Sequence, residues 1–97
     1  MALTSKERAR LRAEANGIDT ILHVGKDGIS ANLIKQADDA LRKRELIKGR
    51  VLENSLYSAK EAAAELAEAT GSETIQVIGS RFVLYRENPE LEKKSGK

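Results

Sequence analysis

Two glycines three positions apart, Gly25 and Gly28, enclose Lys26 and Asp27 in a short G-x-x-G stretch. Such a turn between a strand and a helix lets another backbone approach closely, because no Cβ atom intervenes. The helix that follows points free N–H groups and the positive end of its dipole at the turn, and Lys26 adds positive charge. The stretch could therefore hold a phosphate group. Tight turns without a ligand use the same glycines, and Asp27 disfavours phosphate at its own position, so both interpretations stay open.

Basic residues elsewhere in the chain could extend a phosphate site. Lys48 and Arg50 lie two positions apart on one side of a predicted strand, so we expect that side to be solvated and positive. The candidate flanking contacts are Arg8, Arg12, Lys48, Arg50 and Arg81. Whether they share one surface depends on the fold. The run from Arg42 to Arg44 is explained equally well by the end of a helix, where cations interact favourably with the dipole.

No combination of residues predicts catalysis. His23 is the single histidine and has no paired acid or nucleophile, so we interpret it as a partly exposed strand residue. Asp38 and Asp39 are adjacent in a predicted helix and point about 100° apart, so a salt bridge between Asp39 and Lys35 is the simpler expectation. The sequence contains no Walker or dinucleotide-binding glycine motif. We expect no enzyme activity, no metal, no cofactor and no small-molecule substrate.

Composition restricts the class of protein further. The chain has 97 residues, of which 40% are hydrophobic and 33% charged, a balance typical of one soluble domain. No apolar stretch approaches the roughly 18 residues of a membrane helix, and the N-terminus lacks the apolar core of a signal peptide. The absence of cysteine fits a reducing compartment, so we expect a cytoplasmic protein without a membrane partner. The net charge of +2 permits nucleic-acid binding without requiring it.

Hydrophobic periodicity and capping residues predict seven elements in the order α-β-α-β-α-β-β. The expected ranges are helix 3–17, strand 18–25, helix 30–46, strand 46–53, helix 58–71 and a hairpin over 74–86. Thr4 and Glu7 form a capping box for the first helix. We expect the exposed side of that helix to carry Lys6, Arg8, Arg10 and Arg12. The fold class is a single compact α/β domain with a four-stranded mixed sheet over residues 1–88, followed by a flexible polar tail over 89–97.

The last two strands are predicted to form a hairpin closed by Gly79-Ser80, a two-residue turn with glycine first. This turn predicts the cross-strand pairs Val77–Phe82 and Ile75–Leu84, whose side chains would form the core side. The opposite, outer face mixes polar and apolar residues. Its apolar members are Ile78, Val83 and Tyr85.

Three segments together indicate a family. The stretches "VGKDGIS", "RELIKGRV" and "IQVIGSRFVLYR", in this order and spacing, closely resemble the CRM domain, which is named for chloroplast RNA splicing and ribosome maturation. The nearest match is the bacterial single-domain form, the YhbY family. The resemblance extends from about Leu3 to Arg86. The G-x-x-G stretch alone is weak support, and its combination with the strand and the hairpin is specific.

The resemblance implies a non-enzymatic RNA-binding domain with a fold similar to the C-terminal domain of bacterial translation initiation factor three. It likens the loop of Gly25, Lys26, Asp27 and Gly28 to the backbone-clamping loop of KH domains. The implied partner is ribosomal RNA of the precursor large ribosomal subunit, bound by a monomer that assists its assembly. An alternative is a protein-interaction module recruited by a protein partner, for which the mixed outer face of the hairpin argues. A binder of duplex DNA would share the basic surface but lacks an evident recognition helix.

Overall fold

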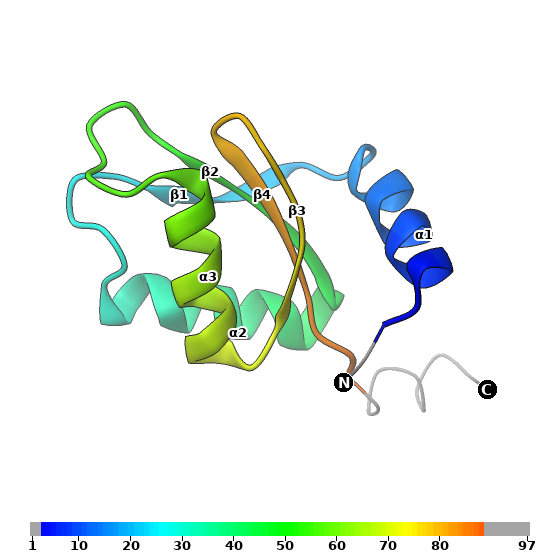
Figure 1. Ribbon diagram of the computed structural model, residues 1–97. Helices are drawn as coiled ribbons and strands as arrows, with labels where there is room; N and C mark the ends of the chain where they lie inside the picture. Colours follow the sequence, from blue (N-terminus) through cyan, green and yellow to red (C-terminus); the bar gives the residue numbers. More distant parts are fainter. Residues whose placement is uncertain (1–2, 89–97) are drawn as a thin grey trace.

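A computed structural model describes residues 3–88 and contains the seven predicted elements in the predicted order (Figure 1). These are α1 (Ser5–Ala15), β1 (Thr20–Val24), α2 (Ala31–Arg44), β2 (Leu46–Val51), α3 (Ala59–Thr70), β3 (Glu73–Ile78) and β4 (Arg81–Tyr85). The tail expected over 89–97 lies outside the described residues. No helix within the described part is long and apolar enough to cross a membrane.

The sheet is mixed, with the strand order β1-β2-β4-β3. β1 pairs in parallel with β2, while β4 runs antiparallel to both β2 and β3. Parallel neighbours need a long crossover connection, and α2 lies in that connection. The prediction of a single α/β domain with a four-stranded mixed sheet is therefore confirmed.

Helices α2 and α3 cover one face of the sheet and enclose the main core (Figure 1). Leu41 of α2 and Leu66 of α3 are fully buried against Leu22, Phe82 and Leu84 of the strands. The side chain of Ser30 caps α2 by accepting a hydrogen bond from the N–H of Leu33, and α3 begins with a capping box like that of α1. Local signals thus determine where each helix starts.

Gly49 in the middle of β2 lets this core close. A Cβ atom at that position would lie inside the contact distance of the Phe82 ring, the register partner of Gly49 on β4. The ring therefore occupies the space that any other residue would fill. Phe82 is 1% exposed, which makes this glycine a packing requirement of the fold.

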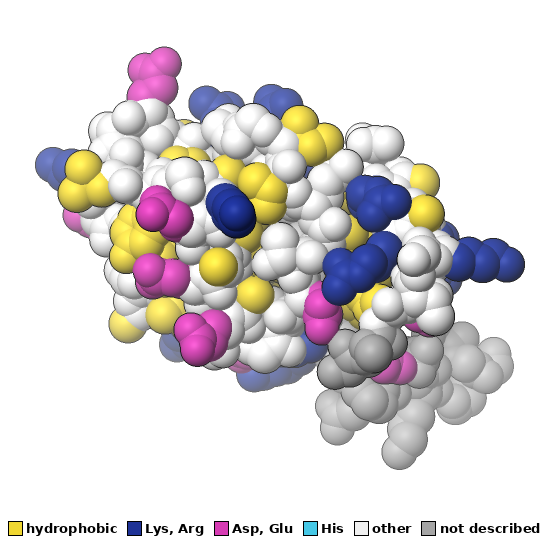
Figure 2. Space-filling model, in the orientation of Figure 1, with side chains coloured by type: hydrophobic (Ala, Val, Ile, Leu, Met, Phe, Trp, Pro, Cys, Tyr) yellow, Lys and Arg dark blue, Asp and Glu magenta, His cyan; other side chains and the backbone are white. Residues whose placement is uncertain are grey.

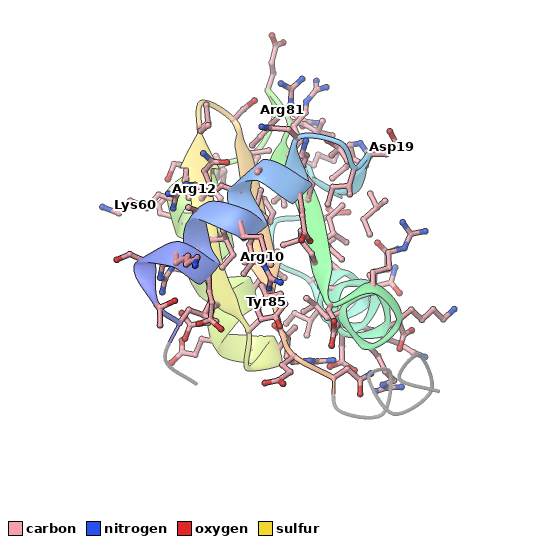
Figure 3. All side chains as sticks on the ribbon, turned by 90° about the vertical axis from the view of Figure 1, so that its right-hand side faces the viewer. Arg10, Arg12, Asp19, Lys60, Arg81 and Tyr85 are labelled. Atoms are coloured by element: carbon pink, nitrogen blue, oxygen red, sulfur yellow. The ribbon has the colours of Figure 1, made fainter. Side chains whose placement is uncertain are left out.

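Helix α1 packs on the opposite face of the sheet, across the hairpin strands (Figure 3). Leu11 and Ala15 bury Val83 and contact the half-buried Tyr85. Val83 and Tyr85 lie on the outer face of the hairpin as predicted, but this face is not open to solvent at these two positions, because α1 covers them.

The predicted hairpin register is correct at its turn and wrong further along. Gly79 has a φ of +57°, as a two-residue turn with glycine first requires, and Val77 pairs with Phe82. An irregularity between Thr74 and Gln76 then shifts the ladder, so that Thr74 pairs with Leu84. Ile75 is displaced from the core face and is buried under α1 instead.

Arg86 fastens the end of the last strand to both core helices. Its guanidinium donates hydrogen bonds of 2.7 Å to Asp38 Oδ1 on α2 and to the carbonyl of Thr70 on α3. The hydrogen bond from Arg86 to Asp38 holds the pKa of the Asp38 carboxyl below its ordinary value. The prediction that Asp39 pairs with Lys35 is wrong, because the Asp39 carboxylate lies 3.9 Å from the Arg42 guanidinium instead.

We predict that Gly49→Ala destabilises the protein by about 1–3 kcal/mol, because the new methyl group overpacks the core against Phe82. Urea unfolding followed by circular dichroism measures the change. Gly17→Ala is the matched control, since its Cβ would meet only the carbonyl oxygen of Glu14 at 3.8 Å. Equal stability of the two variants would contradict the packing role assigned to Gly49.

The Asp38–Arg86 pair predicts a pH-dependent contribution to stability. Because the folded-state pKa of Asp38 is lowered, its contribution is present above the unfolded pKa of about 3.9 and disappears as the pH falls through the folded value. Asp38→Asn should lower the stability at pH 7 by about 1 kcal/mol or less, since the side chain is 35% exposed. The difference from the wild type should shrink below about pH 4 in urea titrations, whereas Asp39→Asn should have little effect at either pH.

Candidate functional site

The Gly25–Gly28 stretch is a closed turn at the carboxyl end of β1. The N–H of Gly28 donates a 3.0 Å hydrogen bond to the carbonyl of Gly25, and Gly28 has a φ of +66°. Lys26 and Asp27 occupy the two central positions and are exposed. Glycine at the fourth position is typical of such a four-residue turn. The turn therefore presents both charged side chains to solvent while the glycines form its base.

The two glycines are not equivalent. A Cβ atom at Gly28 would lie 2.7 Å from Cε1 of the Tyr57 ring, so the fold itself requires glycine there. A Cβ atom at Gly25 would lie 3.7 Å from Asn54 Oδ1 and 3.8 Å from Leu52 Cδ1, which are ordinary contacts. Packing against Tyr57 thus explains the glycine at position 28 without any ligand. The packing around Gly25 does not explain why that position is a glycine.

A shallow cavity of about 190 Å³ lies between this turn and the first turns of α2. His23, Asn32 and Gln36 line it together with the turn. Ser30 Oγ satisfies the N–H of Leu33 at 3.1 Å, while the N–H groups of the preceding residues have no partner within the helix. The cavity therefore combines helix N–H donors, which suit an anion, with the amide side chains of Asn32 and Gln36 and with the opposite charges of Lys26 and Asp27.

His23, Asn32 and Gln36 are the cavity residues that sequence reasoning missed. The sequence predicts His23 only as a partly exposed strand residue, and its side chain is exposed. The spacing of Asn32 and Gln36 by four positions places them on one side of a helix, which is the only sequence signal that could have identified them. Within the described residues, no group of three or more His, Cys, Asp or Glu side chains could hold a metal ion.

Arg50 and Arg81 lie directly opposite each other on β2 and β4. Both are exposed, and Lys48, two residues before Arg50, is half-buried on the same face. We call Lys48, Arg50 and Arg81 the basic strand cluster. None of the three makes an ion pair within residues 3–88, whereas Arg8, Arg10, Arg42 and Arg86 each pair with a carboxylate.

The basic strand cluster adjoins the turn. His23, two residues before Gly25, is the register partner of Arg50 in the parallel pair. The same histidine lines the cavity beside the turn, so the cavity and the cluster share a border. Arg81 lies at the end of the sheet beyond α1 (Figure 3). The structure thus brings together the turn, Lys48, Arg50 and Arg81.

Arg8 does not belong to this site. Its guanidinium lies 3.0 Å from Glu73 Oε1 and donates a 3.2 Å hydrogen bond to the carbonyl of Thr74. The expectation that Arg8 is exposed is wrong, because this pair fastens α1 to β3 and leaves the side chain half-buried. Arg12 is also half-buried on α1, and the end of this helix one turn later, at Ala15 and Asn16, lines a hollow with Lys48 and Arg81.

Comparison with known proteins gives consistent matches over nearly the whole chain. A sequence-family model described as the CRS1 / YhbY (CRM) domain matches residues 3–86. YqeI of Bacillus subtilis, named a probable RNA-binding protein, is 41% identical over 88 residues, which are 91% of this chain and 92% of that protein. MJ0652 of Methanocaldococcus jannaschii, named in the same way, is 40% identical over 86 residues, which are 87% of this chain and 63% of that protein. The solution structure of SAV1595 from Staphylococcus aureus, named there as a candidate RNA-binding protein, has 53% identity and a TM-score of 0.75, and covers 90% of this chain and 91% of that one.

The unequal surroundings of the two glycines predict unequal effects of the same substitution. Gly28→Ala should destabilise the protein by about 1–3 kcal/mol, because it combines a positive φ with a clash against Tyr57. Gly25→Ala should change the free energy of unfolding by about 0.5 kcal/mol or less. Urea unfolding of the two variants in parallel checks this, and equal losses would contradict the structural role assigned to Gly28.

Proposed function

The chain belongs to the CRS1/YhbY (CRM) domain family, and we propose that it is a non-enzymatic RNA-binding protein that grips the RNA backbone with its Gly25–Gly28 turn and basic strand cluster. One observation carries the proposal. Three cations without carboxylate partners among the described residues lie next to a turn that opens on a helix N-terminus. Phosphate groups are the anions that such an arrangement suits.

Each part of the site has a separate task in this proposal. A phosphate in the cavity accepts hydrogen bonds from the first N–H groups of α2, and Lys26 adds a mobile positive charge. Neighbouring phosphates lie on Arg50 and Arg81, whose planar guanidinium groups can bind phosphate through two hydrogen bonds each. Asp27 is an acceptor and meets a ribose 2′-hydroxyl rather than a phosphate, which favours RNA over DNA.

The proposed target is structured ribosomal RNA of the precursor large ribosomal subunit. This proposal rests on the family resemblance of the sequence, and the relatives named as RNA-binding proteins support its first step. The structure weakens the argument for the alternative, a protein-interaction module. Val83 and Tyr85 are covered by α1, and Ile78 alone of the three apolar residues is well exposed.

We predict that the protein binds a large-subunit ribosomal RNA fragment with an affinity that falls as salt rises from about 50 to 200 mM. Lys26→Ala should weaken binding severalfold and reduce the slope of log affinity against log salt by about 1, because one phosphate contact is lost. Its stability should match the wild type, since Lys26 is exposed. Fluorescence anisotropy at four salt concentrations measures both quantities.

Lys43→Ala is the matched control for charge, because Lys43 is an exposed lysine in the last turn of α2, at the opposite end of that helix from the turn. Lys43→Ala should bind like the wild type. Equal binding by the wild type and Lys26→Ala would remove the turn from the interface. Absence of RNA binding by the wild type at the lowest salt would overturn the proposed function.

A further inference from the structure

A second and larger hollow lies on the other side of Tyr57 from the turn. It measures about 850 Å³ and lies between the segment that joins β2 to α3 and the β3–β4 hairpin. The N–H of Val51 donates a 2.7 Å hydrogen bond to the carbonyl of Ser80, so the end of β2 is tied to the hairpin turn. We call this hollow the hairpin groove. Its volume falls within the range of about 300–1,000 Å³ that small-molecule sites occupy.

The arginine side chains that line the hairpin groove favour an anionic ligand. Arg50 and Arg81 both line it, and their opposite positions across the two strands place their Cβ atoms about 4.5–5.5 Å apart. Like charges in that position are destabilising, and neither arginine pairs with a carboxylate in the described part of the chain. A bound phosphate would neutralise this repulsion.

The remaining walls of the hairpin groove do not suit a phosphate alone. Ile78 is 63% exposed, an unusual cost for a large apolar side chain, and it lines the groove together with Leu52 and Tyr57. Glu53, the acidic lining residue, is an acceptor for N–H groups. Hydrophobic and basic side chains gather near the hairpin turn in Figure 2. A ligand with an anionic part, an apolar flat part and N–H donors matches all three features.

Tyr57 and Arg50 connect the hairpin groove to the turn. The Tyr57 ring lies against Gly28 on one side and lines the groove on the other. Arg50 lines the groove and is the register partner of His23, which lines the cavity beside the turn. A nucleic-acid strand held at the turn would therefore reach the groove by passing Arg50 at the end of β2.

We propose that the hairpin groove binds an unpaired nucleotide of the RNA, with its base against Ile78 and Leu52 and its phosphate between Arg50 and Arg81. This inference rests on the proposed function, because the turn holds the adjacent backbone. A base inside a duplex is stacked and paired, so the groove gives a preference for RNA that carries a single-stranded segment beside a helix.

The test compares two RNAs, a fully paired stem and the same stem with a single-stranded uridine extension, by fluorescence anisotropy. The wild type should bind the extended RNA about five- to tenfold more tightly, the lower end of the range for one base stacked on an aromatic side chain. Ile78→Ser should lose most of this preference and keep its affinity for the stem. Leu56→Ser is the matched control, because Leu56 is 92% exposed and lies outside the groove lining. It should behave like the wild type.

The outcomes separate this inference from the proposed function. Equal affinity of the wild type for both RNAs, or a preference that persists in Ile78→Ser, would overturn the hairpin groove as a nucleotide site while leaving RNA binding intact. Loss of affinity for both RNAs in Lys26→Ala together with loss of preference only in Ile78→Ser would support both. Ultraviolet crosslinking of the extension to peptides 51–60 and 61–81 would locate the base directly. Absence of binding to either RNA would remove the proposed function and this inference together.

Discussion

The parallel pairing of β1 with β2 is the constraint on which the whole site depends. Parallel strands bring their carboxyl ends to the same edge of a sheet, so the turn after β1 lies beside Arg50 near the end of β2. β4 runs antiparallel to β2 and begins at that edge, which places Arg81 opposite Arg50. Three segments from distant parts of the chain therefore meet, and the crossover helix α2 points its N-terminus at the same place.

Unequal covering of the two sheet faces leaves room for this site. Two helices bury one face, whereas α1 alone packs on the other and contributes only Leu11 and Ala15 as buried residues. Such a narrow apolar stripe covers the part of the face that carries Leu46, Ile75, Val83 and Tyr85. The Arg8–Glu73 ion pair holds α1 against β3. Arg8 of α1 thus stabilises the fold by attaching the helix to the sheet. Arg50 and Arg81 stay exposed, whereas Lys48 is half-buried and lines a hollow with Ala15 at the end of α1.

The parts of the structure that local chemistry decides could be predicted from the sequence. The capping box of Thr4 and Glu7, the cap at Ser30 and the Gly79-Ser80 turn are all present where the pattern places them. The displacement of Ile75 could not be predicted. The bulge moves this residue out of the main core and buries it under α1, a helix that ends 60 residues earlier in the chain. The ion pair of Arg8 could not be predicted for the same reason, since its partner Glu73 lies 65 residues away.

The residues of the candidate site also fall into two groups, those that can be identified from residue type and those whose role depends on the fold. Its charged members, Lys26, Arg50 and Arg81, could be identified because solvated cations on a strand or in a turn are visible as residue types. His23 acquires significance only beside α2, and Tyr57 only through its contact with Gly28.

Arg50 and Arg81, which face each other across β2 and β4, favour ligand binding over stability as the reason for the residues at this edge of the sheet. A carboxylate in place of either one would form a cross-strand ion pair between β2 and β4 and stabilise the sheet. The chain instead keeps two exposed cations face to face, beside an exposed Ile78. Stability alone explains neither feature. A ligand that carries phosphate next to an apolar ring explains both, because the same bound group would relieve the repulsion and cover the apolar side chain.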